Sequence, residues 1–182
     1  MWVADITYIR LRWEFVFLAV VLDAFSRKAI GWELGRTLET KLTLAALEAA
    51  IAGRHPQPGW VHHSDRGTQY ASNQYVQRLE DCGAHLSMSR PARPWENGIC
   101  ESFIKTLKRE EIEARRYAGF AELRQHLDEF MEQIYNKVRL HSALGYRSPE
   151  EFEQSQKPAV PWSPAALSFV RHDEIYRSDV GS

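Results

Sequence analysis

The pattern of hydrophobic and polar positions in the first third of the chain predicts three β-strands. Residues 3–10 alternate loosely between apolar and polar positions. Residues 15–22 form one continuous β-rich apolar run, which is typical of a strand covered on both faces. Residues 27–34 form the third strand, after a turn-forming stretch at residues 23–26. Because only short links join the three strands, we predict an antiparallel meander.

From residue 40 onward the pattern changes to helices separated by short strands. Helices are expected over residues 40–52, 72–82, 96–113 and 120–138, and short strands over residues 60–63 and 84–88. Thr40 and Ser72 are the predicted N-caps of the first two helices, and Gly53 and Gly83 are the predicted stop signals. Ser148 opens a capping box of sequence Ser-Pro-Glu-Glu, which predicts a further helix.

One stripe of the helix over residues 120–138 is apolar. It consists of Phe120, Leu123, Leu127, Phe130, Ile134 and Val138. The order of the elements predicts an α/β fold with a mixed sheet flanked by helices. We expect one domain over residues 1–157 and an irregular tail over residues 158–182, where prolines are closely spaced.

Composition narrows the class of protein. Of the 182 residues, 44% are hydrophobic and 12% aromatic, which excludes global disorder because such a chain can bury a core. The longest apolar run is too short to span a bilayer, and no charged-then-apolar leader precedes it, so neither a membrane nor secretion is expected. Cys82 and Cys100 lack CxxC or zinc spacing, which fits a reduced, cytoplasmic chain. The net charge of −1 makes the chain no obvious stand-alone nucleic-acid binder.

Three carboxylates stand where they can converge at one rim of the sheet. Asp5 lies in the first strand, Asp65 follows the strand over residues 60–63, and Glu101 lies on the helix that begins near residue 96. Clustered carboxylates repel one another, so their pKa values rise unless a cation lies among them. Oxygen ligands without a Cys or His of metal-ligand spacing favour Mg²⁺ or Mn²⁺. Two such ions can activate the attacking oxygen and stabilise the leaving oxygen of a phosphoryl transfer.

The helix that carries Glu101 has one polar face. The residues within an arc of about 80° are Asn97, Glu101, Lys105 and Lys108. The opposite, buried side is expected to hold Ile99, Cys100, Phe103 and Leu107. The polar face offers a carboxylate to a metal ion and ammonium groups to phosphates. An ordinary solvated helix surface has the same pattern, and this alternative stays open.

Other candidate residues also have an ordinary structural interpretation. His62 and His63 stand just before Asp65, but strand histidines are usually packed or hydrogen-bonded rather than metal ligands. Asn97 is equally suited to cap its helix. The gap of 35 residues between Asp65 and Glu101 is weak by itself, because Glu is a common residue.

Ordered motifs over residues 2–155 resemble those of a known family. They are residues 2–9 (WVADITYI), 19–28 (AVVLDAFSRK), 62–70 (HHSDRGTQY), 87–90 (SMSR), 96–103 (ENGICESF), 106–108 (TLK), 135–146 (YNKVRLHSALGY) and 148–149 (SP). Together they resemble the integrase catalytic core of bacterial insertion-sequence transposases, of the retroviral-integrase-like type. Many ordered motifs in one chain are far more specific than the spacing of three carboxylates.

The resemblance implies a ribonuclease H-like fold and a site of two aspartates and, after a gap of 35 residues, a glutamate. It gives the catalytic and metal-binding roles to Asp5, Asp65 and Glu101, with two Mg²⁺ or Mn²⁺ ions in the active state. Lys108 matches the family's basic residue seven positions after the glutamate. The implied DNA contacts are Asn97, Lys105, Lys108, Arg90 and Arg93.

The resemblance also implies an activity, that of a metal-dependent polynucleotidyl transferase that cleaves DNA ends and joins a 3′-hydroxyl to target DNA. A stand-alone nuclease of the same fold, and a non-catalytic remnant that binds DNA or a partner, stay open as alternatives. The implied partners are the element ends and the target DNA, with a homo-oligomer at the nucleoid when active. Trp95 and Glu96 replace the family's usual tyrosine and aspartate. Met1 falls almost at the first strand, so we expect a core without the family's end-binding region.

Overall fold

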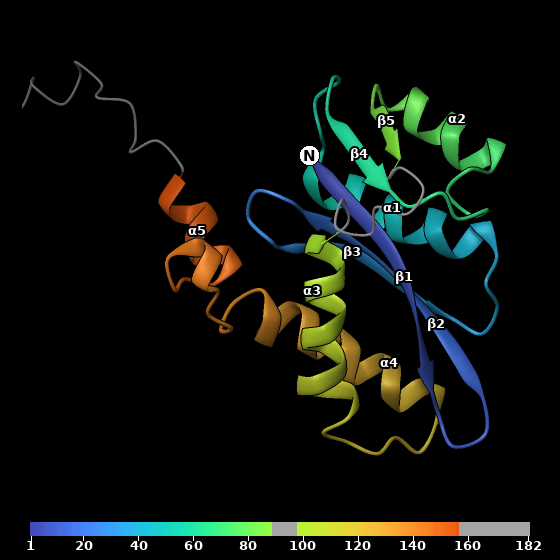
Figure 1. Cartoon of the computed structure of the whole chain (residues 1–182), viewed down its shortest axis with the longest axis vertical. Helices are drawn as coiled ribbons and strands as arrows, with labels where there is room; N and C mark the ends of the chain where they lie inside the picture. Colours follow the sequence, from blue (N-terminus) through green and yellow to red (C-terminus); the bar gives the residue numbers. More distant parts are fainter. Residues whose placement is uncertain (89–97, 157–182) are drawn as a thin grey trace, which may run out of the picture.

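A mixed five-stranded sheet forms the centre of the protein in the computed structural model, which describes residues 1–88 and 98–156 (Figure 1). Its strands are β1 (Trp2–Arg10), β2 (Phe15–Asp23), β3 (Ala29–Gly35), β4 (Val61–Ser64) and β5 (His85–Met88). Their order across the sheet is β3-β2-β1-β4-β5. β1, β2 and β3 are antiparallel neighbours, whereas β4 is parallel to both β1 and β5. The predicted meander and the predicted mixed sheet are therefore confirmed.

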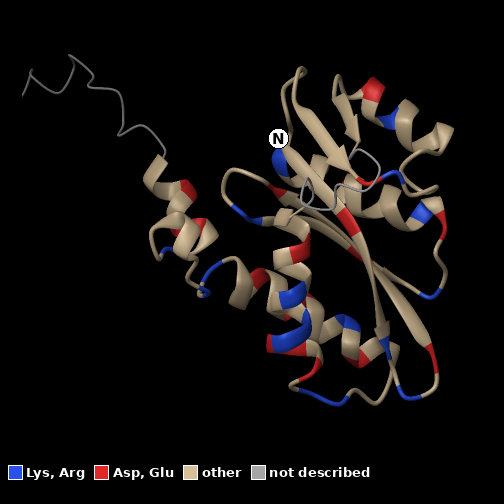
Figure 2. Ribbon diagram, in the orientation of Figure 1, with Lys and Arg blue, Asp and Glu red and all other residues tan. Residues whose placement is uncertain are grey.

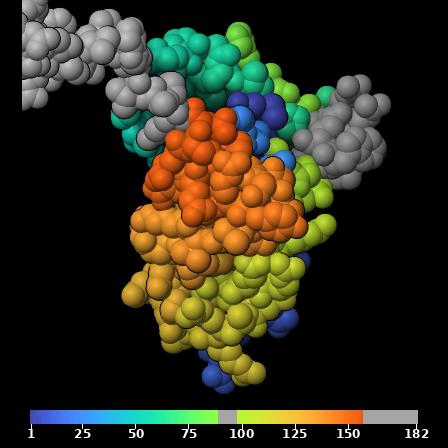
Figure 3. Space-filling view, turned by 90° about the vertical axis from the view of Figure 1, so that its left-hand side faces the viewer, coloured from blue at the N-terminus to red at the C-terminus, as the bar shows by residue number. Residues whose placement is uncertain are grey.

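Helices cover both faces of this sheet. They are α1 (Thr40–Arg54), α2 (Asn73–Asp81), α3 (Gly98–Leu107), α4 (Phe120–Glu129) and α5 (Pro149–Gln156). α1 and α2 pack on one face, and α3 and α4 pack on the other. Figure 3 shows the segment that leads to α5, in orange, beside α3, in yellow-green. Within the described ranges no helix is long and apolar enough to cross a membrane. The predicted helix start near residue 96 and the predicted tail lie outside these ranges.

The sheet separates two hydrophobic cores, and β2 contributes to both. Leu18 and Val20 belong to the core beneath α3 and α4, whereas Ala19 and Val21 belong to the core beneath α1 and α2. None of the four is more than 1% exposed. Because both faces of β2 are covered, its sequence is a continuous apolar run rather than an alternation.

α1 packs very closely on β3 at Gly31. A Cβ atom at Gly31 would overlap the carbonyl oxygen of Ala46 and would lie 2.7 Å from the backbone nitrogen of Ala50. Only glycine therefore permits this distance between the helix and the strand.

Two predicted caps are confirmed. The Ser72 hydroxyl accepts a hydrogen bond from the Tyr75 N–H at 3.3 Å, at the start of α2. At the start of α5, the Ser148 hydroxyl accepts from the Glu151 N–H at 3.3 Å, and the Glu151 carboxylate accepts from the Ser148 N–H at 2.9 Å. This reciprocal pair is a capping box.

The predicted ends of α1 are wrong by one or two residues. Glu39 has extended backbone angles (φ −108°, ψ 159°) and is the N-cap, so Thr40 is already helical. The helix continues through Gly53 to Arg54. Its C-cap is His55, which has a left-handed backbone (φ 46°) and donates its N–H to the Ile51 carbonyl. A single glycine weakens a helix without necessarily ending it.

π-helical turns interrupt both long helices of the second half, and the sequence pattern did not reveal them. The turns are Lys108–Ile112 after α3 and Phe130–Tyr135 after α4. A π turn holds an extra residue, so the positions after it rotate away from the predicted stripe. Val138 is 69% exposed, while Met131 is fully buried. The predicted stripe therefore does not continue to Val138.

Candidate active site

Asp5 and Asp65 line one cavity of about 230 Å³ at the edge of β1, which we call the acidic cavity. β4 pairs with β1 only at Trp2 and Val3, so β1 has no described strand partner on that side from Asp5 onward. Asp65 directly follows β4, which runs parallel to β1. The topology thus brings the two predicted aspartates to the same rim of the sheet.

A tight turn after β4 holds the Asp65 side chain. Its Oδ1 accepts a hydrogen bond from the Gly67 N–H at 2.8 Å. A Cβ atom on Gly67 would lie only 2.9 Å from that oxygen, so the glycine makes room for the carboxylate. Asp65 is exposed, so ions and solvent can reach it.

Asp5 is electrostatically coupled to the other two predicted carboxylates. Its Oδ1 accepts a hydrogen bond from the Ile6 N–H at 2.8 Å. Burial is the largest cause that raises the pKa of Asp5, to about 6; the negative charges of Asp65 and Glu101 add to the rise, and the Ile6 bond opposes it. A cation bound among these groups would offset the repulsion.

Glu101 lies near the acidic cavity but does not line it. It is a half-buried residue of α3, and α3 packs against β1. In the part of the chain that the structure describes, no three His, Cys, Asp or Glu side chains gather closely enough to hold a metal ion. The structure therefore brings two predicted carboxylates together and leaves the third on an adjacent helix.

The amphipathic character predicted for α3 is confirmed. Cys100 and Phe103 are buried, whereas Lys105 is exposed. The ammonium nitrogen of Lys108 lies 4.9 Å from the centroid of the Tyr8 ring on β1. The other predicted DNA contacts, and the two departures from the family pattern, lie outside the described residues; they are Arg90, Arg93, Asn97, Trp95 and Glu96.

The histidines before Asp65 are packed strand residues, as the structural interpretation predicted. His62 is fully buried, its Nε2 lies 3.0 Å from the Tyr75 hydroxyl, and burial lowers its pKa to about 4. His63 Nδ1 lies 2.9 Å from the Ser87 hydroxyl. Neither histidine lines the acidic cavity.

The sequence analysis missed a surface that extends from the acidic cavity to the β1–β2 hairpin. We call Tyr8, Arg10, Arg12, Trp13 and Phe15 the hairpin surface. The guanidinium carbon of Arg10 lies 5.7 Å from the Phe15 ring centroid, and that of Arg12 lies 4.7 Å from the Trp13 ring. Trp13 is 83% exposed and Tyr8, which lines the acidic cavity, is 60% exposed. Figure 2 shows the basic residues at this hairpin in blue. Arginines interleaved with aromatic residues around a short turn were the available sequence signal.

Sequence comparison identifies relatives along nearly the whole described chain. Two family profiles, both described as integrase core domain, match residues 1–94 and 82–149. The transposase for insertion sequence element IS904 of Lactococcus lactis subsp. lactis (strain IL1403) is 42% identical over 154 residues. The match covers 85% of this chain and 61% of that protein.

Solved structures share the fold. A chain of the simian T-cell lymphotropic virus intasome, in complex with PP2A regulatory subunit B56 gamma, matches with a TM-score of 0.68 and 19% identity, over 98% of this chain and 59% of that chain. The HTLV-2 integrase catalytic core domain in complex with magnesium (trimeric form) matches with a TM-score of 0.64 and 15% identity, over 83% of this chain and 93% of that one.

These likenesses and the mixed sheet define the fold as ribonuclease H-like, as predicted. The chain belongs to the integrase core domain family, with insertion-sequence transposases among its relatives. It spans between 53% and 61% of the length of four curated relatives that it matches.

Proposed function

We propose that the chain is the catalytic core of an insertion-sequence transposase, a polynucleotidyl transferase that cleaves DNA ends and joins a 3′-hydroxyl to target DNA. The observation that carries the proposal is the convergence of Asp5 and Asp65 on one cavity, in a chain of the integrase core family. The name of the Lactococcus relative as a transposase supports the same activity.

In this proposal Asp5, Asp65 and Glu101 hold Mg²⁺ or Mn²⁺, with two ions in the active state. Carboxylate oxygens are the ligands that these ions prefer, and the mutual repulsion that helps to raise the Asp5 pKa is what a cation relieves. When bound, such ions activate an attacking oxygen and stabilise a leaving oxygen. The HTLV-2 neighbour was solved with magnesium. Glu101 does not line the acidic cavity, but its charge helps to raise the Asp5 pKa, which supports its place in the set.

Basic residues around the acidic cavity contact the DNA backbone in this proposal. Lys105 orients phosphates from α3 and Lys108 from the π turn that follows it. The arginines of the hairpin surface extend the contact along β1. At about 3.3 Å per residue, Arg10 at the end of β1 lies about 17 Å along the strand from Asp5, which corresponds to about five base pairs. Asn97, Arg90 and Arg93 remain predicted contacts, and a homo-oligomer remains the predicted active form.

Metal binding by the chain tests the proposed ligands. We expect Mn²⁺ to bind the parent chain and to raise its melting temperature, because an ion that binds only the folded state stabilises it. Asp5→Asn, Asp65→Asn and Glu101→Gln should each weaken Mn²⁺ binding about tenfold or more, because each removes a charged ligand. Glu132→Gln, at an exposed position of the second π turn, is the matched control. Equal Mn²⁺ affinity in the parent and the Asp5→Asn variant would show that Asp5 is not a metal ligand and would contradict the proposed site.

DNA processing separates the proposed function from its alternatives. Labelled duplexes with a free 3′-hydroxyl are incubated with the chain and Mg²⁺ or Mn²⁺. Joined products that disappear in the Glu101→Gln variant support the transferase. Metal-dependent cleavage without joining supports the nuclease, and DNA binding without either reaction supports the non-catalytic remnant.

A further inference from the structure

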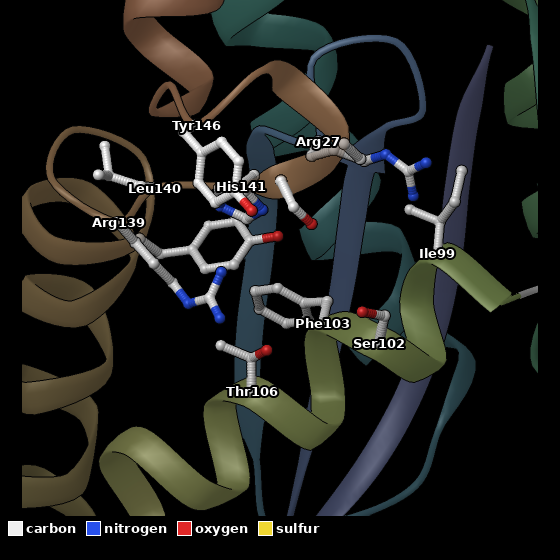
Figure 4. Close-up of a pocket in the computed structure, with 12 residues that line it drawn as sticks. Arg27, Ile99, Ser102, Phe103, Thr106, Arg139, Leu140, His141 and Tyr146 are labelled. Carbon is white, nitrogen blue, oxygen red and sulfur yellow. The ribbon is translucent and has the colours of Figure 1, made fainter.

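A second and larger cavity, of about 480 Å³, is lined in part by α3 (Figure 4). None of its lining residues lines the acidic cavity. Three separate segments build it: α3 with Ser102 and Thr106, the β2–β3 turn with Arg27, and the loop after the second π turn with His141 and Tyr146. A cavity of this volume is in the range of small-molecule and cofactor sites.

The lining of this cavity is rich in hydrogen-bond donors and carries positive charge. Arg27 and Arg139 line it, and among the described residues no carboxylate does. Arg139 donates to Glu110 at 2.8 Å and 3.2 Å, and Glu110 lies outside the lining. Within residues 1–88 and 98–156 the guanidinium of Arg27 has no hydrogen bond or ion pair. The cavity is therefore suited to an anion.

His141 leaves one buried polar atom without a partner at this cavity. Its Nε2 is buried and has no hydrogen-bond partner among the described residues. The ring is held edge-on against Tyr135, with centroids 5.0 Å apart, and the His141 N–H donates to the Arg147 carbonyl at 3.0 Å. Burial is the first cause that lowers the pKa of His141 to about 4, so the ring is neutral at physiological pH. The fixed nitrogen at the cavity wall is therefore available for a hydrogen bond with a group bound there.

The backbone at the cavity is strained at two of its lining residues. Arg27 (φ 62°) and Tyr146 (φ 57°) have left-handed backbones; the third such non-glycine residue in the described chain is His55. The left-handed region costs a residue with a Cβ atom about 1 kcal/mol, and such strain is concentrated at ligand sites. Both residues line the cavity (Figure 4). Tyr146 is 73% exposed.

We propose that this cavity binds a phosphate group carried by a nucleotide, either free or within a DNA strand. The Arg27 guanidinium and the hydroxyls of Ser102 and Thr106 supply donors for phosphate oxygens, as phosphate sites require. The exposed Tyr146 ring offers a stacking face for the base. Ser102 directly follows Glu101 on α3, so a bound strand lies on a neighbouring face of the helix that carries the proposed metal ligand. The inference depends on the proposed function only if the bound phosphate belongs to a DNA strand.

Titration of the full chain with inorganic phosphate and with 5′-dAMP tests the cavity. Binding is followed by calorimetry and by the ¹⁵N shift of His141 Nε2. We expect dAMP to bind more tightly than phosphate, because it can also stack. Arg27→Gln should weaken dAMP binding about tenfold or more, because a charged hydrogen bond is lost. Arg116→Gln removes the same charge at an exposed position outside the cavity and should bind dAMP like the parent.

His141→Phe is a second test variant, in which stability and dAMP affinity should not fall together. Phenylalanine keeps the ring contact with Tyr135 and removes the unpartnered nitrogen, so the melting temperature should stay the same or rise. Binding of dAMP should nevertheless weaken, which a purely structural role would not produce. A His141→Phe variant that binds dAMP like the parent, or equal losses in Arg27→Gln and Arg116→Gln, would overturn the proposal.

The source of the phosphate is distinguished with DNA. If Arg27→Gln weakens both dAMP and duplex affinity, the cavity holds a phosphate of the DNA strand. If dAMP affinity falls while duplex affinity and metal binding are those of the parent, the cavity holds a free nucleotide. Both results support a phosphate site. The absence of saturable binding of phosphate and dAMP at millimolar concentration rejects it, whatever the outcome for Mn²⁺ at Asp5.

Discussion

Lys108, the first residue of the π turn after α3, contacts Tyr8 on the strand that carries Asp5, because the Lys108 ammonium lies 4.9 Å from the Tyr8 ring centroid. A cation over an exposed aromatic ring contributes about 0.5–1 kcal/mol. The contact is therefore too weak to hold α3 alone. It does place a positive charge at the rim of the acidic cavity, which Tyr8 lines.

Lys108→Ala should lower DNA affinity and reduce the dependence of log affinity on log salt concentration by about 0.9 for each lost phosphate contact. It should also lower the melting temperature slightly, because the contact with Tyr8 is lost. Lys105→Ala removes an exposed lysine of the same helix and should change the salt dependence without the loss of stability. Fluorescence anisotropy at several salt concentrations measures the slopes. An unchanged slope in Lys108→Ala would exclude Lys108 as a phosphate contact.

Arg12→Gln should weaken duplex binding at low salt, because Arg12 lies on the exposed hairpin surface beside Trp13. The matched control is Arg116→Gln, which removes one charge from an exposed position after the first π turn. We expect a weaker affinity and a smaller salt slope for Arg12→Gln alone. If both variants lose the same affinity, the effect is that of net charge, and the hairpin surface has no special role.

The stability of the metal-free chain should depend on the ionisation of Asp5. Its folded pKa of about 6 lies above the reference value of 3.8, so the folded state holds the proton more tightly than the unfolded state. Proton binding at Asp5 therefore adds to the free energy of unfolding. This contribution is complete below about pH 4 and is lost as the pH rises through about 6. Asp5→Asn should therefore be more stable than the parent at pH 8, by at most about 3 kcal/mol, and equally stable at pH 3.5.

Urea unfolding of both chains across this pH range, with and without Mg²⁺, measures the difference. Mg²⁺ should stabilise the parent more than the variant at pH 8, because only the parent keeps the full set of carboxylates. A stability difference that does not change between pH 3.5 and pH 8 would mean that Asp5 is not buried among negative charges.

The sheet was predictable from the sequence because its signals are local. The continuous apolar run of β2 follows from burial on both faces, and Ser72 and Ser148 bond to residues three positions away. The meeting of Asp5 with Asp65 also follows from simple topology, since β4 lies parallel to β1.

Other features depend on contacts between distant segments and were not predictable. The first π turn buries Glu111, whose carboxylate accepts from the Tyr117 hydroxyl at 2.9 Å and pairs with Arg115 at 3.1 Å. No periodicity in the sequence reports such a local change of pitch. The cavity at His141 likewise needs the β2–β3 turn and α3, which are far apart in the sequence.

Two glycine-to-alanine substitutions should have opposite effects on stability, because α1 packs closely at one site and faces open space at the other. At Gly31 a Cβ atom would overlap the Ala46 carbonyl and would lie 2.9 Å from the Ala50 Cβ, so α1 must move away from β3. We expect Gly31→Ala to lower the free energy of unfolding by about 1–3 kcal/mol, as overpacking does.

Gly53 lies in the last turn of α1, and nothing lies within 4 Å of a Cβ atom built there. Gly53→Ala should raise the free energy of unfolding by about 0.5–1 kcal/mol, because alanine loses less conformational entropy in a helix. Urea unfolding followed by circular dichroism measures both variants under the same conditions. If Gly31→Ala were as stable as Gly53→Ala, α1 could not pack on β3 at the distance described, and the layer that covers this face of the sheet would be placed wrongly.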